Sequence, residues 1–424
     1  MTDYADADYF MDLSLVDDPY PYFEALRAGG PVRRLPHHDV VAVTGFDEAL
    51  AVHLDTEHFS AVNSVTGPLP PIPFKPAGDD ITAQIAAHRP QMPFGEEVLT
   101  QDPPRHAQLR SLMTPLFTAK RVREMEPEIT RLADLLIDEF AAGGRCELMG
   151  EYSRPFATLA IADLLGVPDE DRAGFRAILN ATPSPSQVGA GEDYRPVNPM
   201  DFRRNKFLAY IEDRRRAPQG DILSDLANAR YPDGSTPAAA DVVRVATLLF
   251  GAGQDTTATL LGNALRIVAE RPELQQPLRA EPGLIPDFLE EVLRHSGPVK
   301  STFRLARKPT SLGGVAIPVG TTLMNATAAA NRDPRHFDHP TEFRLGRPRA
   351  REHLAFGRGI HTCPGAGLAR TEARISLERM LARLGDIRID AERHGPADAR
   401  RCAYLPTYIF RTLKQLHLRF EPAA

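Results

Sequence analysis

The run Phe356-Gly357-Arg358-Gly359-Ile360-His361-Thr362-Cys363-Pro364-Gly365 places one cysteine in a loop bracketed by glycines. Gly359 and Gly365 carry no side chain, so the backbone can turn sharply there and a large flat group can approach it closely. The residues that follow have a helical period, which predicts that Cys363 lies at a helix N-terminus. Free N–H groups and the helix dipole favour a thiolate at such a position.

A lone cysteine has three common interpretations: an inert buried residue, a catalytic nucleophile or a metal ligand. Protease nucleophiles seldom need the clearance that these glycines give. A closed zinc site needs further Cys or His ligands, but Cys146 and Cys402 lack a CxxC partner and His361 is separated from Cys363 by one residue. One thiolate beside open space suits haem iron. From the loop alone, the haem-thiolate and the buried-cysteine interpretations both stay open.

Length and composition set broad limits on the protein. A chain of 424 residues could hold up to about three domains, but it has no linker, repeat or low-complexity tract, so one large, mainly helical unit is expected. Three cysteines argue against a disulfide framework and for a reducing compartment. The acidic N-terminus lacks an apolar signal or anchor, and a net charge of −6 gives no reason to expect nucleic acid or an anionic membrane as a partner. We therefore expect a soluble cytoplasmic protein.

Helical periods and short β-type runs divide the chain. The segment from Gly67 to Phe94 is rich in proline and carries Phe74 and Met92, which predicts a binding loop or lid, with surface irregularity as the alternative. A second proline-rich break at 182–199 is predicted as the matching half of an entrance. Helices are expected at 19–27, 122–140, 201–215, 237–270 and 286–295, and strands at 32–35 and 40–43.

The helix expected at 237–270 would be about 50 Å long and must pass through the core. Its middle reads Ala252-Gly253-Gln254-Asp255-Thr256-Thr257, with Gly251 just before. Two glycines cost about 1 kcal/mol each relative to alanine, and threonine hydroxyls compete for backbone carbonyls. The functional interpretation is a local opening for small ligands in which Asp255 and Thr256 relay protons. The alternative is a solvated kink with a surface acid.

Three features, in chain order, resemble the cytochrome P450 superfamily of haem-thiolate monooxygenases, in particular its soluble bacterial-type members. They are the A-G-x-D-T-T notch, the E-x-x-R pair of Glu291 and Arg294, and the cysteine loop. Segments 102–110, 329–334 and 337–343 also match, so the resemblance extends almost end to end. It implies a mainly α fold with small β-sheets: one two-lobed domain, 1–424, around a buried haem. The β-rich lobe is expected at roughly 30–60 plus 300–350, and the helical lobe in the remainder.

The resemblance implies haem b (iron protoporphyrin IX) as cofactor, with Cys363 as the axial iron ligand and Gly365 and Phe356 against the porphyrin. By spacing alone, Glu291 and Arg294 would be a solvated surface pair; the resemblance instead implies a structural network under the haem, with Arg344 or Arg347 joining. Cationic or donor groups are expected on the haem propionates: His106, Arg110, Arg304, His353 and His361.

The resemblance also implies the reaction. Asp255 and Thr256 match the family's acid–alcohol pair, which manages protons while one oxygen atom of O2 enters a C–H or C=C bond. The chain contains no flavin or iron–sulfur motif, so electrons are expected from NAD(P)H through a ferredoxin or flavodoxin with its reductase. The protein itself is expected to be a monomer. A docking patch for the electron donor on the cysteine side is predicted, with merely solvated charges as the alternative: Arg110, Lys120, Arg121 and Arg358.

Other functions stay open at this point. A peroxide-driven peroxygenase of the same fold typically alters the acid–alcohol position, which is intact here. A haem-based sensor or carrier needs no proton relay and usually has an attached output domain. A cysteine hydrolase would be supported by absence of haem in the purified protein.

The substrate is expected to be a hydrophobic small molecule, such as a terpenoid, steroid, fatty acid, polyketide or substituted aromatic. Lys300 is a candidate anchor for an acidic group, with an outward-pointing lysine as the alternative. The resemblance predicts ten pocket residues: Phe74, Met92, Phe94, Leu248, Leu249, Ala252, Val299, Thr302, Tyr408 and Ile409.

Overall fold

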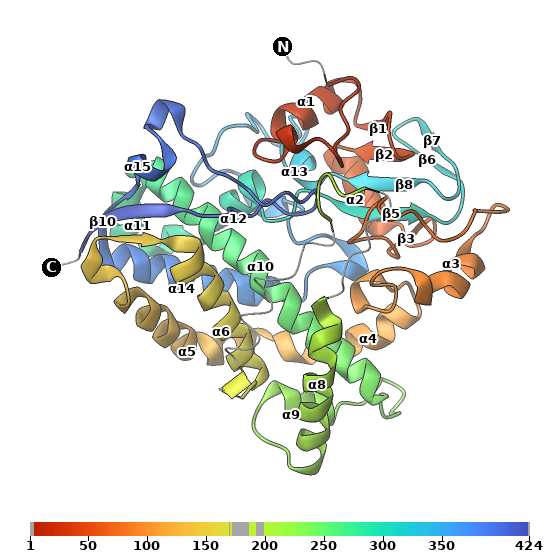
Figure 1. The fold of residues 1–424 in the computed structure, drawn as a ribbon, viewed down its shortest axis with the longest axis horizontal. Helices are drawn as coiled ribbons and strands as arrows, with labels where there is room; N and C mark the ends of the chain where they lie inside the picture. The colour runs from red at the N-terminus through yellow and green to blue at the C-terminus, as the bar shows by residue number, and fades with distance from the viewer. Residues whose placement is uncertain (1–3, 169, 172–185, 192–198, 423–424) are drawn as a thin grey trace.

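The computed structural model of the chain describes residues 4–168, 170–171, 186–191 and 199–422 (Figure 1). The proline-rich break predicted at 182–199 therefore lies, except for 186–191 and Pro199, outside the described residues. Across the described ranges, no helix combines the length and the apolar character needed to cross a membrane.

Helices form most of the fold, and the five predicted from the sequence begin and end within three residues of the expected positions. They include the long helix in the middle of the chain. The bounds are α1 (Tyr20–Ala28), α2 (Phe46–Leu54), α3 (Thr82–His88), α4 (Arg105–Met113), α5 (Ala119–Asp138), α6 (Arg154–Leu165), α8 (Pro199–Arg216), α9 (Ile222–Ala227), α10 (Ala239–Glu270), α11 (Gln275–Ala280), α12 (Ile285–Ser296), α13 (Thr327–Ala330), α14 (Ala366–Arg383) and α15 (Ala391–His394).

Three small sheets complete the described part of the chain. The largest has the strand order β1-β2-β8-β5-β3, in which β2 and β8 run parallel and the other neighbours antiparallel. It lies at one side of the molecule, apart from most of the helices (Figure 1). The strands are β1 (Val32–Arg34), β2 (Val40–Val43), β3 (Phe59–Ser60), β5 (Thr302–Ala306) and β8 (Thr322–Asn325) in this sheet, β4 (Arg145–Glu147), β10 (His417–Pro422) and β9 (Leu384–Ile389) in the second, and β6 (Thr310–Leu312) with β7 (Val315–Ile317) in the third.

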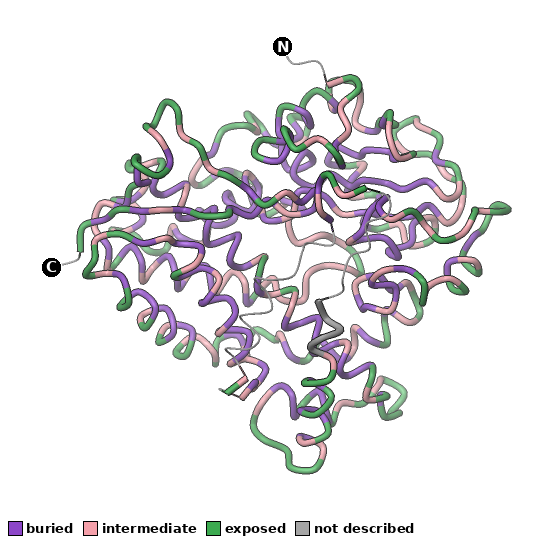
Figure 2. Tube along the Cα trace, viewed as in Figure 1, coloured by how far each residue is buried: buried purple, intermediate pink, exposed green. Residues whose placement is uncertain are grey.

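The helix α10 crosses the centre of the molecule and organises the core (Figure 1). At about 1.5 Å per residue, its 32 residues span about 48 Å. It packs against α6, α8, α12 and α14, and most of its length is buried (Figure 2). Full burial of a large apolar side chain such as Phe250 stabilises the fold by roughly 1.5–3 kcal/mol. The helix therefore forms through tertiary burial despite the glycines in its middle.

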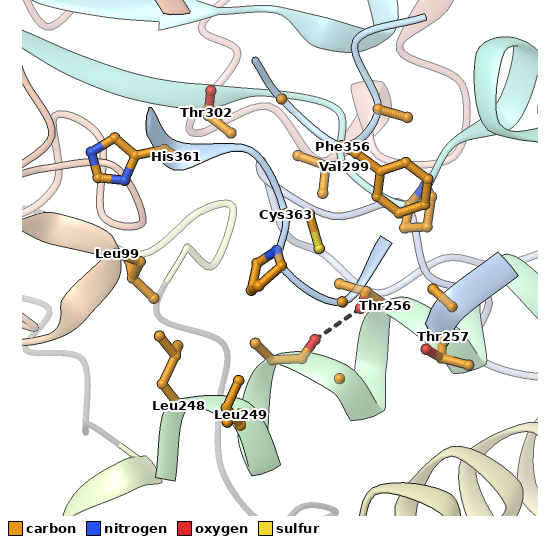
Figure 3. A pocket seen from close by; sticks show the side chains of 18 of the residues that line it. Leu99, Leu248, Leu249, Thr256, Thr257, Val299, Thr302, Phe356, His361 and Cys363 are labelled. Atoms are coloured by element: carbon orange, nitrogen blue, oxygen red, sulfur yellow. Dashed lines mark hydrogen bonds between the residues drawn. The ribbon is translucent and has the colours of Figure 1, made fainter. Parts of the chain in front are cut away.

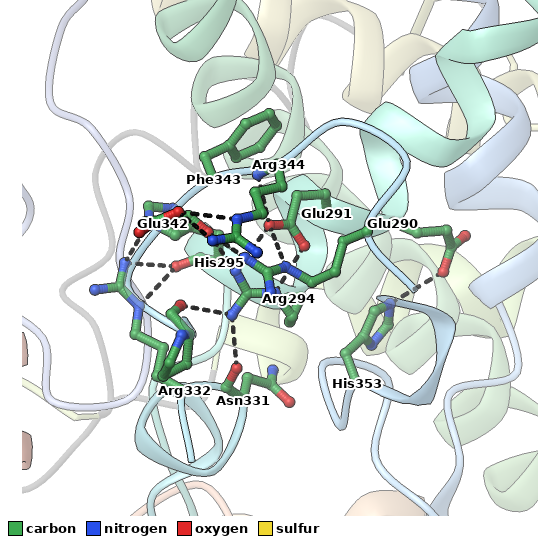
Figure 4. Close-up of polar contacts among 12 residues, drawn as sticks. Glu290, Glu291, Arg294, His295, Asn331, Arg332, Glu342, Phe343, Arg344 and His353 are labelled. Carbon is green, nitrogen blue, oxygen red and sulfur yellow. Dashed lines mark hydrogen bonds and ion pairs between the residues drawn. The ribbon is translucent and has the colours of Figure 1, made fainter. Parts of the chain in front are cut away.

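Glu291 and Arg294 on α12 form a buried network, not a solvated surface pair (Figure 4). Arg294 Nε and Nη2 donate to the two Glu291 carboxylate oxygens at 2.7 and 2.8 Å. Arg347 Nε donates to the same carboxylate at 2.8 Å, whereas Arg344 contributes its backbone N–H at 2.9 Å. The guanidinium groups of Arg294 and Arg347 also donate to backbone carbonyls of segment 331–342. The network thereby ties α12 to the irregular chain that precedes the cysteine loop.

Candidate functional site

Backbone contacts fix the loop that carries Cys363. The Cys363 N–H donates to the Phe356 carbonyl at 2.9 Å, and Arg110 of α4 donates to the carbonyl just before the cysteine at 2.5 Å. Gly359 has a φ of +71°, and a Cβ there would lie 2.7 Å from the backbone oxygen of His53 on α2. Only glycine meets both conditions at this position.

Cys363 lies just before the N-terminus of α14 and is half-buried. Burial raises the pKa of the Cys363 thiol, and the Gly365 N–H with Arg110 and Arg370 acts in the opposite direction. A metal cation bound at the sulfur would favour the thiolate. Within the described part of the chain, no three His, Cys, Asp or Glu side chains gather as a zinc site requires.

A cavity of about 350 Å³ separates the cysteine loop from the middle of α10 (Figure 3). Ala252, Gly253 and Thr256 line it from the helix, so the polar notch and the Cys363 thiol border the same space. Thr256 Oγ1 donates to the Ala252 carbonyl at 2.8 Å. Asp255 is exposed and does not line the cavity. The notch is therefore an opening on a cavity, not a solvated kink.

Most of the remaining lining is apolar, and it includes half of the predicted substrate residues. Leu248, Leu249, Ala252, Val299 and Thr302 line the cavity. Apolar side chains that were not predicted lie among them: Val65, Val98, Leu99, Met113, Phe117, Ile161, Leu260, Leu293, Leu354 and Leu368.

The other predicted substrate residues do not line this cavity. Phe74 and Met92 pack into a small separate core with Val62, Ile81, Ile85 and Leu305, and Phe94 is also buried. Tyr408 and Ile409 belong to the main core, where the Tyr9 hydroxyl donates to the Tyr408 carbonyl at 3.0 Å. Phe74 and Met92 of the proline-rich segment therefore pack into this separate core and not into the cavity.

Nitrogen donors gather around His361. His106 and Arg110 come from α4 and Arg304 from β5, and all four residues line the cavity. The ring centroids of His106 and His361 lie 4.2 Å apart. Burial, helped by the nearby arginines, lowers the pKa of His106 to about 4 and that of His361 to about 2, so both rings are neutral at pH 7. Among the described residues that line the cavity, only Glu372 carries a carboxyl group, so this donor cluster suits an anionic ligand.

His353 lies apart from these donors. Its Nδ1 accepts from the Ala355 N–H at 3.2 Å, so Nε2 carries the proton and donates to Glu290 at 3.1 Å. Glu290 also binds Arg370, whose guanidinium carbon lies 4.6 Å from the centroid of the Phe356 ring. The His353 ring also lies directly beside the Phe356 ring, with centroids 5.9 Å apart, but His353 does not line the cavity.

Two ionisable residues of the cavity, Glu372 and His53, were not predicted. Glu372 lies on the same face of α14 as Leu368 and Ile375, and this helical spacing is a signal in the sequence that an acid faces the interior. Its carboxylate accepts from the Thr257 hydroxyl at 3.1 Å, and burial raises its pKa to about 8. His53 on α2 is the second, and nothing in its local sequence distinguishes it.

Charged residues singled out in the sequence have local roles. Lys300 is buried, not outward-pointing, and does not line the cavity; its Nζ lies 5.8 Å from the centroid of the Tyr9 ring. Of the predicted docking patch, Arg110 faces the cavity, whereas two members pair with acids and Arg358 donates to the Glu352 carbonyl at 2.9 Å. The paired members are Lys120, 3.7 Å from Glu124, and Arg121, 2.6 Å from Asp225.

Comparisons with known proteins agree on one family. The family model described as Cytochrome P450 matches residues 179–385. The cytochrome P450 monooxygenase PikC of Streptomyces venezuelae is 34% identical over 411 residues, covering 95% of this chain and 91% of that protein. The 6-deoxyerythronolide B hydroxylase of Saccharopolyspora erythraea is 32% identical, with 86% of each chain covered. The substrate-free structure of Mycobacterium marinum cytochrome P450 CYP150A6 is similar over the full length of both chains, with 53% identity and a TM-score of 0.93.

Proposed function

This chain belongs to the cytochrome P450 family and is a haem-thiolate monooxygenase; from that premise we propose that its substrate is a small-to-medium hydrophobic molecule. One oxygen atom of O2 enters a C–H or C=C bond of that molecule. The observation that carries the substrate class is the apolar lining that Leu248, Leu249 and Val299 contribute to the cavity. Relatives named as hydroxylases of 6-deoxyerythronolide B and of vitamin D(3) support the same class.

The cavity residues fit a haem. Cys363 offers one thiolate, and the donors around His361 offer N–H groups for two carboxylates. We assign Cys363 as the residue that would bind the haem iron, Phe356 and Gly365 as residues that would contact the porphyrin, and His106, Arg110, Arg304 and His361 as donors that would hold the propionates. When bound, the haem supplies the oxidising chemistry, and the protein supplies positioning and proton control.

We assign Thr256 and Asp255 to proton delivery. Because Thr256 Oγ1 donates to the Ala252 carbonyl, its lone pairs remain able to accept a hydrogen bond from the cavity. Rotation of the hydroxyl then turns its proton toward the cavity. Asp255, the adjacent residue, is exposed and exchanges protons with water. The pair thereby links solvent to the cavity.

Thr256→Ala tests this assignment. The variant is expected to bind substrate like the parent but to divert electrons to hydrogen peroxide, measured as product formed per NAD(P)H consumed. Thr247→Ala is the matched control. Thr247 Oγ1 donates to the Val243 carbonyl, four residues before it in α10, at 2.8 Å, as Thr256 does to Ala252, but Thr247 does not line the cavity. Coupling as high in Thr256→Ala as in the control would reject the assignment.

A titration of the holoprotein tests the substrate class. Apolar compounds are expected to displace water from the cavity and shift the haem spectrum from low to high spin, while charged compounds of equal size leave it unchanged. A shift produced only by the charged compounds would overturn the proposed class.

We further propose that a ferredoxin or flavodoxin, reduced from NAD(P)H through its reductase, docks over the cysteine loop. Leu54 and Ile360 are 57% and 38% exposed there, and Leu54 lies beside Gly359. Arg351, whose side chain is 70% exposed although it lies 3.6 Å from Asp287, adds positive charge for an acidic partner. Turnover with such a donor is expected to exceed turnover with hydrogen peroxide. Faster turnover with peroxide would favour a peroxygenase.

A further inference from the structure

His53 is a buried donor without a partner at the wall of the cavity. It stands in the last turn of α2, is 5% exposed and lines the cavity. Its Nε2 is buried and has no hydrogen-bond partner among the described residues. His58, five residues further on, instead binds Asp55 at 2.9 Å. A buried nitrogen without a partner is costly, so a polar ligand is expected to satisfy it.

The groups that face His53 are donors, not acceptors. Its electrostatic neighbours are Arg304 from β5, Arg358 from the cysteine loop and His361. Together with burial, the two arginines lower the pKa of His53 to about 3, so the ring is neutral and carries one N–H. None of these neighbours carries a carboxylate, so the surroundings of His53 favour an anionic ligand.

The ring is also held in place. The His53 carbonyl lies against Gly359, and its Cε1 lies 3.8 Å from the position of a Cβ on Gly357. Both glycines have positive φ and belong to the loop that carries Cys363. His53 therefore packs against the cysteine loop with both its backbone and its ring, beside the donor cluster around His361.

We propose that His53 donates a hydrogen bond to a propionate carboxylate of the haem, as a fifth donor beside His106, Arg110, Arg304 and His361. This inference rests on the proposed assignment of those four residues to the propionates. If the histidine served packing alone, an apolar side chain would fill the same volume without an unpaired nitrogen. His53 is thus a positioning residue for the cofactor.

The rate of haem loss from the holoprotein to excess apomyoglobin tests the proposal. His53→Leu is expected to lose haem about tenfold faster than the parent, because one hydrogen bond to a charged group is removed. His53→Gln keeps an N–H donor and is expected to restore most of the difference, and His58→Leu is expected to match the parent. If Leu is not accommodated, His53→Ala serves the same comparison. Equal rates in the parent and the apolar variants would overturn the proposal.

Reconstitution with haem dimethyl ester separates a bond to the carboxylate from packing. The ester lacks the carboxylates, so the difference in haem loss between parent and His53→Leu is expected to disappear; a difference that persists would overturn the proposal.

The reduced carbon-monoxide spectrum of the parent separates failure of the role of His53 from failure of the proposed haem site. If the parent shows a thiolate spectrum but His53 does not affect haem loss, only the role of His53 fails. If the parent shows no thiolate spectrum, the proposed site itself fails.

Discussion

Glu291→Gln is expected to destabilise the protein by about 3–5 kcal/mol, because it breaks a buried ion network from one side. The side chains of Arg294 and Arg347 are 0% and 3% exposed, and the ion pairs that both make among the described residues run to Glu291. Glutamine keeps the shape of the side chain but removes the charge. Three charge-assisted hydrogen bonds, each worth about 1.5–3 kcal/mol, are weakened or lost, and two buried guanidinium groups lose their counter-charge.

Urea unfolding of the holoproteins, followed by helical circular dichroism, measures this loss. Glu128→Gln is the matched control, because Glu128 and Arg131 have the same E-x-x-R spacing on α5 but are 48% and 61% exposed. The control is expected to change the unfolding free energy by no more than about 0.5 kcal/mol. An equally small change in Glu291→Gln would refute the reasoning that burial makes this pair structural.

Two further predictions concern residues of the candidate site, Glu372 and Gly359. The pKa of Glu372 is about 8 in the fold against an ordinary 4.5, so the stability that depends on its proton is full below pH 4.5 and is lost as pH rises through about 8. Glu372→Gln is expected to remove a decline of about 1.4 kcal/mol per pH unit inside this window, seen in urea midpoints against pH; an unchanged slope would contradict the shift. Gly359→Ala is expected to lower the melting temperature and weaken the thiolate spectrum, because its Cβ would meet the His53 carbonyl and its φ is positive. Gly367→Ala, in α14 with open space around the added Cβ, is expected to keep the spectrum and add up to about 1 kcal/mol of stability; equal melting temperatures for the two variants would contradict the steric argument.

The sequence predicts α10 and the cysteine loop well because both depend on local signals. The glycines of the loop reflect backbone angles, and α10 is long, apolar and bounded by start and stop residues. The polar notch also stands out, because glycine and threonine are unfavourable inside an apolar helix. The comparison of these signals with a known family then indicates the chemistry.

Tertiary partners could not be predicted in the same way. The spacing of Glu291 and Arg294 suggests a solvated face, because nothing nearby in the sequence shows that Arg347, 56 residues later, completes a buried network. Phe74 and Met92 are apolar in a proline-rich segment, but the sequence does not say that they pack onto a satellite core instead of the cavity. Burial by distant segments decides both cases.

The direction in which the side chains of His53 and His353 point could not be predicted from the sequence either. His53 lies in the last turn of an ordinary helical segment, and only the fold brings it against the cysteine loop. His353 has the right chemistry for a propionate, but the fold directs its Nε2 proton to Glu290. Glu372 is different, because its place on the apolar face of α14 was visible as a helical period.

The reduced carbon-monoxide difference spectrum of the purified protein tests the central claim most directly. Ligation of haem iron by Cys363 predicts a strongly red-shifted Soret band in the parent and its absence in Cys363→Ala. A haem–carbon monoxide band at the unshifted position in the parent, or a red-shifted band that persists in Cys363→Ala, would contradict the account.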